Sequence, residues 1–359
     1  MRARIPFSRA ATRKVPGLVL MIGALWAAPA VAGAEDEGRV AGGDRIETAV
    51  ELSRQFASAD TVVVARSDEY ADALAGAPLA SSLDAPILLT HPDGLTDTVE
   101  VEIARLGADD AVLLGGQAAL SAQVERELEG LGLAAERVDG EDRFDTAAQI
   151  AERLPDPDRA YVVRGIGDTP DTGWEDAVAV SALAAFEGNP ILLSTTDALP
   201  DATRTALETS GIEDARLVGG PAVLSSQVTT EVAEALDLEL DPNVAFPIRW
   251  AGDDRYSTST IIADESMRAG MDPSTVWVAT GRDYPDSLAA APLVGATTAD
   301  TTGGGVLLLV DGADLDRSAA SQQWLEANAD DIDRLRAVGG PAVITDETLE
   351  TARATAGLD

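Results

Sequence analysis

Unbroken apolar runs recur along the chain in three sets, with helical patterns between them. The first run of each set is Thr61-Val-Val-Val-Ala, Ala160-Tyr-Val-Val or Thr275-Val-Trp-Val-Ala, and the second is Pro86-Ile-Leu-Leu-Thr, Pro190-Ile-Leu-Leu-Ser or Gly305-Val-Leu-Leu-Leu. The third run ends in a glycine pair that begins at Gly115, Gly219 or Gly339 and precedes another helix. Apolar runs without alternation, set between helices, predict parallel strands covered on both faces.

A motif precedes each set and is the clearest repeat in the chain. It reads Arg39-Val-Ala-Gly-Gly-Asp44-Arg45-Ile-Glu-Thr-Ala, Arg137-Val-Asp-Gly-Glu-Asp142-Arg143-Phe-Asp-Thr-Ala and Arg249-Trp-Ala-Gly-Asp-Asp254-Arg255-Tyr-Ser-Thr-Ser. The copies start 98 and 112 residues apart, a period suited to a small domain and too long for a solenoid unit. Asp44 is the expected N-cap of the helix that follows, with Glu47 at the capping-box position. The chain therefore contains three copies of one α/β unit.

A helix of small residues follows the first strand of every copy, and an aromatic residue stands two positions before an aspartate at its entrance. The pairs are Tyr70 with Asp72, Trp174 with Asp176 and Tyr284 with Asp286. Alanine and glycine in this helix let it lie close against a sheet. Insertions at 165–173 and 297–304 are rich in glycine and in other residues of turns, so we expect surface loops there.

The N-terminus has the pattern of a secretory signal peptide. A basic leader without acidic residues is followed by an apolar run from Val15 to about Ala28 and by small residues up to Ala34. The alternative is an N-terminal membrane anchor, which the short run and its Pro16 disfavour. We expect a signal peptide at 1–34 and repeats at 35–136, 137–240 and 241–359.

The charge of the chain disfavours one class of partner. Five of the 26 basic residues lie in the leader, so 21 stand against 62 acidic residues in the rest of the chain, a balance of −41. A field of this sign repels nucleic acid. Lys14 is the only lysine, and an acidic surface without lysine suits a saline habitat. Because cysteine is absent, stability must come from core burial.

Residues for common catalytic sites are missing from the repeated pattern. His91 is the only histidine, and its counterpart in the second copy is Thr195, so we expect no metal and no cofactor. The dinucleotide and P-loop glycine motifs are absent, and the glycine pairs are interpreted as tight turns between strand and helix. No Gly-x-Ser-x-Gly elbow is present either. We therefore expect a protein that is not an enzyme.

Residues at two repeated stations are candidates for binding a ligand: Arg45, Arg143, Arg255, Asp72, Asp176 and Asp286. Arginine is suited to bidentate contact with carboxylate or phosphate. The three arginines therefore form either ion pairs to a neighbouring copy or a cationic spot for an anionic polymer. The three aspartates are either helix N-caps or acceptors for sugar hydroxyls. The residue pattern leaves both pairs of alternatives open.

Together these stations resemble the cell-wall-binding repeat 2 family. The resemblance covers residues 39–359 and is carried by the repeated Asp-Arg motifs, the aromatic-x-Asp stations, the Ile-Leu-Leu strands and the glycine turns. It implies three modules, each a short parallel sheet flanked by helices in a Rossmann-like or toprim-like α/β fold, packed with pseudo-threefold symmetry. The third copy departs from the pattern at Gly305 and at Ser259.

The resemblance also implies a function. Members of the family are exported by Gram-positive bacteria and attach without a covalent bond to anionic secondary wall polymers. We therefore expect a secreted protein of the cell wall or cell surface whose partner is an anionic wall polymer or a peptidoglycan-associated glycan, with no nucleic-acid partner and no membrane span after signal cleavage. Two alternatives stay open, namely an amidase-like protein associated with wall hydrolysis and a soluble scaffold or ligand-binding protein.

Overall fold

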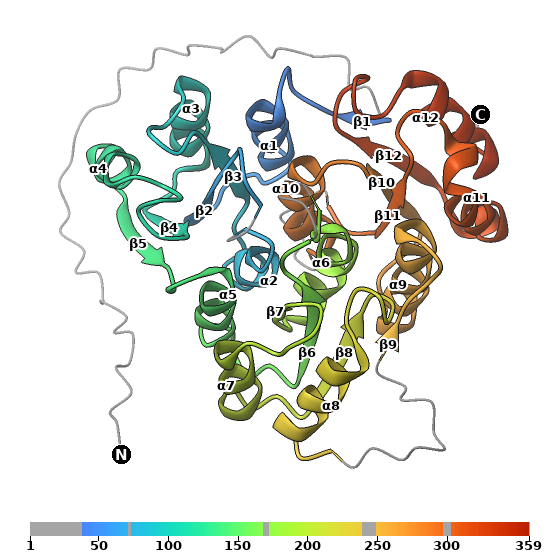
Figure 1. The fold of residues 1–359 in the computed structure, drawn as a ribbon. Helices are drawn as coiled ribbons and strands as arrows, with labels where there is room; N and C mark the ends of the chain where they lie inside the picture. Colours follow the sequence, from blue (N-terminus) through green and yellow to red (C-terminus); the bar gives the residue numbers. More distant parts are fainter. Residues whose placement is uncertain (1–37, 71–72, 168–171, 239–248, 297–302, 359) are drawn as a thin grey trace, which may run out of the picture. The chain divides into compact units, whose positions relative to one another are not determined.

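In a computed structural model, residues 36–359 form one compact unit, distinct from the first 35 residues. The structure describes residues 38–70, 73–167, 172–238, 249–296 and 303–358 (Figure 1). The expected signal peptide at 1–34 lies outside these residues, as do Asp72 and parts of both predicted loops. None of the described helices is long and apolar enough to cross a bilayer.

Three four-stranded sheets, with every pairing parallel, form the framework of the unit. The first has the order β3 (Ile87–Thr90), β2 (Thr61–Arg66), β4 (Asp110–Leu114), β5 (Ala134–Val138). The second has the order β7 (Ile191–Ser194), β6 (Arg159–Arg164), β8 (Asp214–Val218), β9 (Arg249–Trp250). The third has the order β11 (Val306–Val310), β10 (Thr275–Thr280), β12 (Arg334–Val338), β1 (Arg39–Val40). The expected α/β fold of three similar modules is confirmed.

Helices cover these sheets, and in every module they occur at the same stations. The α-helices of the described residues are α1 (Arg45–Ser53), α2 (Gly76–Ser82), α3 (Asp97–Leu106), α4 (Ala122–Gly130), α5 (Arg143–Ala151), α6 (Glu175–Glu187), α7 (Asp201–Thr209), α8 (Ser226–Ala235), α9 (Arg255–Ala269), α10 (Pro285–Val294), α11 (Ala319–Ala327) and α12 (Asp346–Thr355). Two short 3-10 helices, Leu315–Ser318 and Ala329–Asp331, flank α11.

The repeated motif connects two modules, because it begins as an edge strand of one sheet and ends as a helix of the next. Strand β5 closes the first sheet, whereas α5 packs on β7 of the second. In the same way β9 closes the second sheet, and α9 packs on β11 of the third. Strand β1 closes the third sheet, and α1 packs on β3 of the first. The expected boundary between 136 and 137 therefore falls inside β5. Each module supplies a helix to its own sheet, and the segment just before that helix is the edge strand of another module's sheet.

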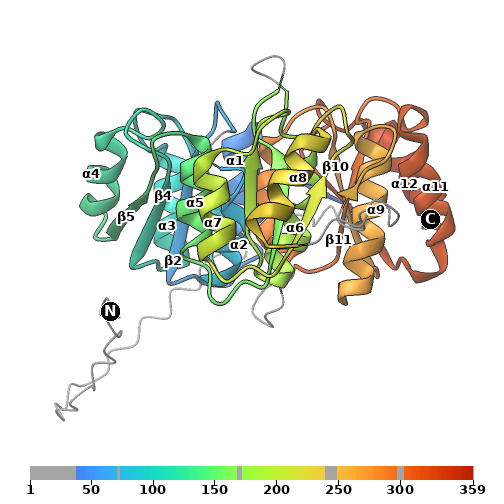
Figure 2. The same ribbon diagram turned by 60° about the horizontal axis from the view of Figure 1, so that its bottom comes forward.

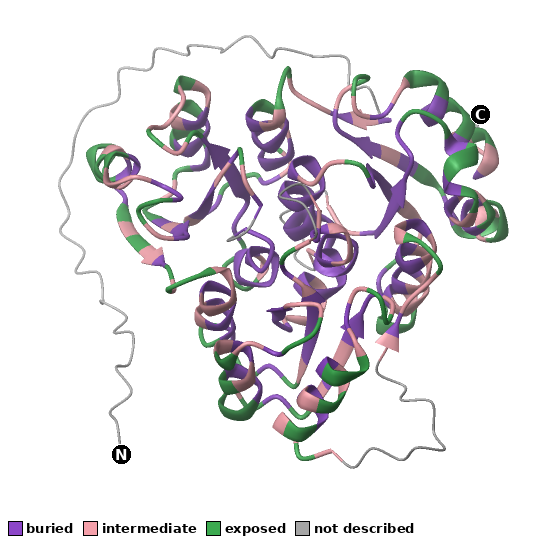
Figure 3. Ribbon diagram, viewed as in Figure 1, coloured by how far each residue is buried: buried purple, intermediate pink, exposed green. Residues whose placement is uncertain are grey.

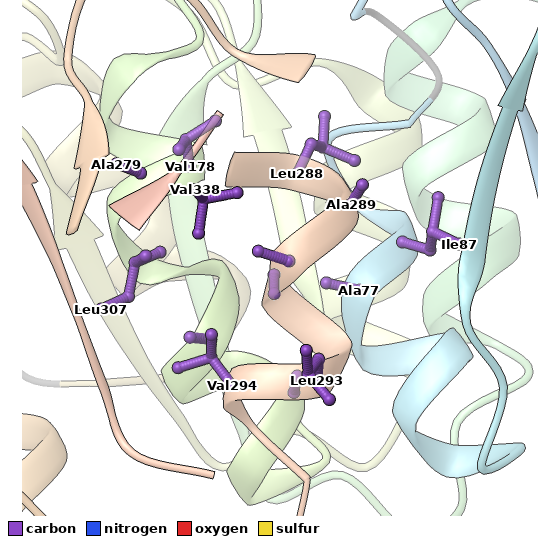
Figure 4. Close-up of a cluster of buried hydrophobic side chains, with 14 of the residues drawn as sticks. Ala77, Ile87, Val178, Ala279, Leu288, Ala289, Leu293, Val294, Leu307 and Val338 are labelled. Atoms are coloured by element: carbon purple, nitrogen blue, oxygen red, sulfur yellow. The ribbon is translucent and has the colours of Figure 1, made fainter. Parts of the chain in front are cut away.

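The small-residue helices α2, α6 and α10 contact one another where the modules meet (Figures 1 and 2). They are the most completely buried helices in Figure 3, in contrast to outer helices such as α4 and α7. Ala77 of α2, Val178 of α6 and Ala289 of α10 lie in this shared core (Figure 4). The approach is close, since a Cβ added at Gly295 would lie 2.6 Å from the carbonyl oxygen of Ala182. Small side chains therefore let three helices share one core.

The motif helices begin as the sequence predicts. Asp44 accepts hydrogen bonds from the backbone N–H groups of Ile46 and Glu47, both at 2.9 Å. Asp142 and Asp254 cap α5 and α9. The predicted capping box at Glu47 differs in detail, because the Glu47 carboxylate accepts from the N–H of Gly43 and not from that of Asp44.

Candidate functional site

The strand order places a topological switch point in every module. The chain leaves the first strand of a module toward one edge of the sheet and returns to its other side, so that in the first module β2 lies between β3 and β4. In open parallel sheets, ligands bind outside the carboxyl ends of the two strands at such a point. The aromatic-x-Asp station follows the first of these strands, and the glycine pair follows the second. Two stations far apart in the sequence therefore meet at the carboxyl ends of these two strands, and we call this place the switch-point crevice.

The aspartate of each described station lies against the first glycine of the pair. A Cβ added at Gly219 would lie 2.4 Å from Oδ2 of Asp176, and one added at Gly339 would lie 2.4 Å from Oδ2 of Asp286. Both glycines have a positive φ, 115° and 102°. The N-cap interpretation of these aspartates is wrong, because Trp174 and Tyr284 occupy the cap positions and the aspartates lie in the first helical turn. Asp72, the third member, lies outside the described residues.

Burial raises the pKa of both aspartates. The pKa of Asp176 rises to about 7 because of burial and the nearby Glu175 carboxylate, while Arg164 and Arg255 oppose the shift. The pKa of Asp286 rises to about 6 through burial and Asp283, with Arg45 opposing. The Oδ1 atom of Asp286 is buried and has no hydrogen-bond partner among the described residues. A buried acceptor without a donor suits a ligand that supplies a hydroxyl group.

The first arginine of every motif holds the glycine turn of the preceding module. Its guanidinium donates to the carbonyl of the first glycine of the pair. These bonds run from Arg39 to Gly339 at 2.6 Å, from Arg137 to Gly115 at 2.7 Å and from Arg249 to Gly219 at 2.6 Å. Because this bond recurs in all three modules, we infer that the first arginines stabilise the glycine turn that borders the switch-point crevice.

The second arginine of every motif crosses from its own module to the preceding one. Arg45 donates to the Ser67 carbonyl at 2.9 Å and forms an ion pair with Asp283 at 3.4 Å. Arg143 binds the Gly165 carbonyl at 3.0 Å and Glu69 at 3.5 Å. Arg255 binds the Gly281 carbonyl at 2.5 Å and Glu175 at 2.9 Å. The predicted ion pairs to neighbouring copies are therefore present, and two of the three acids are glutamates.

The aromatic residues of the three stations converge, which sequence reasoning missed. The ring centroids of Tyr70 and Tyr284 are 5.3 Å apart, and those of Trp174 and Tyr284 are 6.0 Å apart. Each second arginine lies over one of these rings at 5.7–5.9 Å: Arg45 over Tyr284, Arg143 over Tyr70 and Arg255 over Trp174. The recurrence of an arginine followed by an aromatic residue at the same two stations of all three copies was the signal that could have indicated this cluster.

These arginines keep part of their surface open to solvent. The exposed fraction of the side chain is 40% for Arg45, 22% for Arg143 and 36% for Arg255. Ion pairs at such exposure contribute about 0–1 kcal/mol each, so an anionic ligand can compete for the guanidinium groups. Among the residues that the structure describes, no three His, Asp or Glu side chains gather in a way that could hold a metal ion.

Replacement of Gly219 by alanine is expected to lower the free energy of unfolding by about 2 kcal/mol, because the new methyl group strains a left-handed backbone and meets Asp176. Gly220 is the matched control, since nothing lies within 4 Å of its added Cβ. Gly220→Ala is expected to change stability by less than about 1 kcal/mol. Denaturant unfolding of both variants measures the difference, and equal effects would contradict the close approach at Gly219.

Fold and crevice together define a class of protein: tandem α/β modules that share a core and present a repeated arginine–aromatic–aspartate site. The family described as Cell wall binding domain 2 (CWB2) matches residues 39–125, 137–229 and 249–349. The chain belongs to this family of cell-wall-binding domains.

Known proteins share this sequence in part. The chain is 31% identical over 256 residues to the N-acetylmuramoyl-L-alanine amidase LytC of Bacillus subtilis (strain 168), covering 71% of this chain and 47% of that protein. It is 32% identical over 257 residues to the amidase enhancer of the same organism, covering 71% of this chain and 33% of that protein. The chain thus spans about half or less of the length of these relatives.

Two solved structures share the fold. Cwp8 from Clostridium difficile aligns with a TM-score of 0.74 and 28% identity, over 90% of this chain and 52% of that one. Cwp6 from Clostridium difficile aligns with a TM-score of 0.76 and 24% identity, over 90% of this chain and 48% of that one.

Proposed function

We propose that this protein is an exported, non-catalytic wall-binding protein that holds an anionic wall polymer without a covalent bond. The observation that carries the proposal is the threefold recurrence of a partly exposed arginine over an aromatic ring. An arginine can bind a phosphate or carboxylate group, and the aspartate can accept a sugar hydroxyl. Arg45, Arg143, Arg255, Asp176 and Asp286 are the described residues assigned to this contact, and Asp72 is assigned by its station.

A strongly acidic protein can bind an anionic polymer only through local cationic sites. The whole chain carries a net charge of −36, and long-range repulsion is screened beyond about 8–10 Å at physiological salt. Contact arginines then act at short range, where screening is weak. Three related arginine sites on one compact unit also let a repeating polymer bind at several points, which increases avidity.

Sedimentation with purified cell walls tests this function. The protein is expected to sediment with intact walls and to stay in solution after the secondary polymers have been extracted. The triple variant Arg45→Gln, Arg143→Gln, Arg255→Gln is expected to bind at least about tenfold more weakly, because charge-assisted contacts are lost. A control triple variant at Arg54, Arg268 and Arg317 removes exposed arginines that pair within a single turn of their own segment. Equal binding to stripped peptidoglycan would rule out the polymer as ligand.

A role in wall hydrolysis is the alternative, because two curated relatives are an amidase and an amidase enhancer. The second and third modules each hold a carboxyl group with a raised pKa, Asp176 and Asp286, and Asp286 is 8% exposed. Zymography on wall-containing gels is expected to show no cleared band. A band that disappears in the Asp286→Asn variant would replace the binding function with hydrolysis.

A further inference from the structure

The three switch-point crevices differ in charge at one position. The last residue of the first strand is Arg66 in the first module, Arg164 in the second and Thr280 in the third. Arg66 is neutralised by two carboxylates, Asp68 at 2.7 Å and Glu69 at 3.0 Å. Arg164 forms no ion pair with any described residue, and its Nε is buried without a hydrogen-bond partner there. The residue two positions after it is Ile166, where the first module has Asp68.

A second arginine of this module, Arg249, also forms no ion pair within the part of the chain that the structure describes. Arg137 pairs with Glu125 at 3.0 Å, and Arg39 pairs with Asp346 at 3.0 Å. The equivalent Arg249 donates instead to the hydroxyl of Thr229 at 2.7 Å. Its other bond goes to the carbonyl of Gly219, so this arginine and Asp176 contact the same glycine. Among the described residues, the second module thus has two arginines without carboxylate partners, one at the end of β6 and one in the edge strand β9.

A buried guanidinium nitrogen without an acceptor loses its hydrogen bonds to water and gains none in the protein, which is unfavourable. The chain has 62 acidic residues, so an arginine that pairs with none of the described carboxylates is unusual. Arg164 influences Asp176 electrostatically and opposes the rise of its pKa. Because burial raises the pKa of Asp176 to about 7, part of its negative charge is absent at neutral pH, and its protonated form donates a hydrogen bond.

We propose that the crevice between β6 and β8 is an anion-binding subsite, in which Arg164 binds the phosphate or carboxylate group of a wall-polymer repeat unit. The identity of the ligand as a wall polymer rests on the proposed function, whereas the anion site itself rests on the arginines. The first module cannot bind an anion in this way, because its own carboxylates occupy Arg66. The third module lacks the guanidinium. The three modules are therefore related in fold and unequal in ligand chemistry.

Substitution at Ile166 tests the subsite without changing Arg164. Ile166 is 46% exposed, so its replacement leaves the core intact. Ile166→Asp supplies the carboxylate that the first module has at this position, and Ile166→Asn supplies the same shape without charge. Isothermal titration of the full chain with inorganic phosphate and, separately, with glucuronate measures binding and distinguishes the two anionic groups. Ile166→Asp is expected to weaken binding at least about tenfold, and Ile166→Asn less than about threefold.

Arg164→Gln and Arg66→Gln form a second matched pair. The first is expected to abolish anion binding, and the second to leave it unchanged. Equal titrations for wild type, Ile166→Asp and Arg164→Gln would overturn the subsite, as would an equal loss in Arg66→Gln. Wall sedimentation of the same variants separates the two proposals: retained sedimentation with no anion site overturns only the subsite. An anion site in a protein that does not sediment overturns the wall-binding function and leaves the subsite standing.

Discussion

Val40→Asp is expected to lower the free energy of unfolding by about 3–5 kcal/mol, the largest effect we expect for a single substitution in an edge strand. Val40 is only 5% exposed, and it lies in the two-residue strand β1 that closes the third sheet. The backbone bonds that hold this strand include those from Ala337 N–H to the Gly38 carbonyl at 2.8 Å and from Gly339 N–H to the Val40 carbonyl at 2.9 Å. A buried carboxylate at this position would expel the strand.

Loss of β1 would also release Arg39 from the glycine turn at Gly339, so the effect extends to the third crevice. Val101→Asp is the matched control, because Val101 is 68% exposed on α3. The control is expected to cost less than about 1 kcal/mol. Denaturant unfolding measures the change in the free energy of unfolding, and hydrogen exchange of the β12 amides shows whether the change is local to the third sheet. Unchanged protection of β12 in Val40→Asp would show that the third sheet does not need its N-terminal strand.

Asp176→Asn is expected to stabilise the protein at pH 8 by about 1–3 kcal/mol and by only about a third of that amount at pH 5. The pKa of Asp176 is about 7 in the folded protein, above the ordinary value of 3.8. The folded state therefore binds a proton that the unfolded state has released between about pH 4 and pH 7, and its stability falls as pH rises through this range. Above pH 7 the ionised carboxylate is buried next to Glu175, with Arg164 and Arg255 compensating only in part.

The asparagine side chain has the shape of the protonated carboxyl group and cannot ionise, so it removes this pH dependence. Asp197→Asn is the control, because Asp197 is exposed in the loop after β7. Thermal unfolding of both variants at pH 5 and pH 8 measures the effect. Equal stabilisation at both pH values would mean that charge burial at Asp176 is not the cause.

Local patterns were sufficient for the module and its elements. The valine-rich and Ile-Leu-Leu runs became the central strands, because residues buried on both faces of a parallel sheet leave no alternation. Asp44 became an N-cap, because its short carboxylate can satisfy free N–H groups of the first turn. Asp176 resembled such a cap in sequence, but the N-cap of α6 is Trp174, two residues earlier. The carboxylate of Asp176 lies against Gly219 instead.

Long-range placement accounts for what local patterns missed. The aromatic cluster of Tyr70, Trp174 and Tyr284 depends on how three helices pack, and no spacing along the chain encodes the distance between their ends. The destination of β1 is equally non-local, since Arg39 lies 300 residues from Gly339 in the sequence. The missing partners of Arg164 are also decided in space, because pairing depends on which carboxylates the fold brings within reach.

The sequence by itself determined that the protein consists of three α/β copies, where their strands and helix starts lie, and which arginines and aspartates recur. These properties follow from short-range hydrogen bonding and from the periodicity of burial, which are present in any local window of the chain. Only the tertiary structure decided that each motif bridges two modules, that its second arginine lies over a neighbour's aromatic ring, and that the crevices differ in charge. Those features depend on contacts between modules, whose geometry arises only when the three small-residue helices share one core.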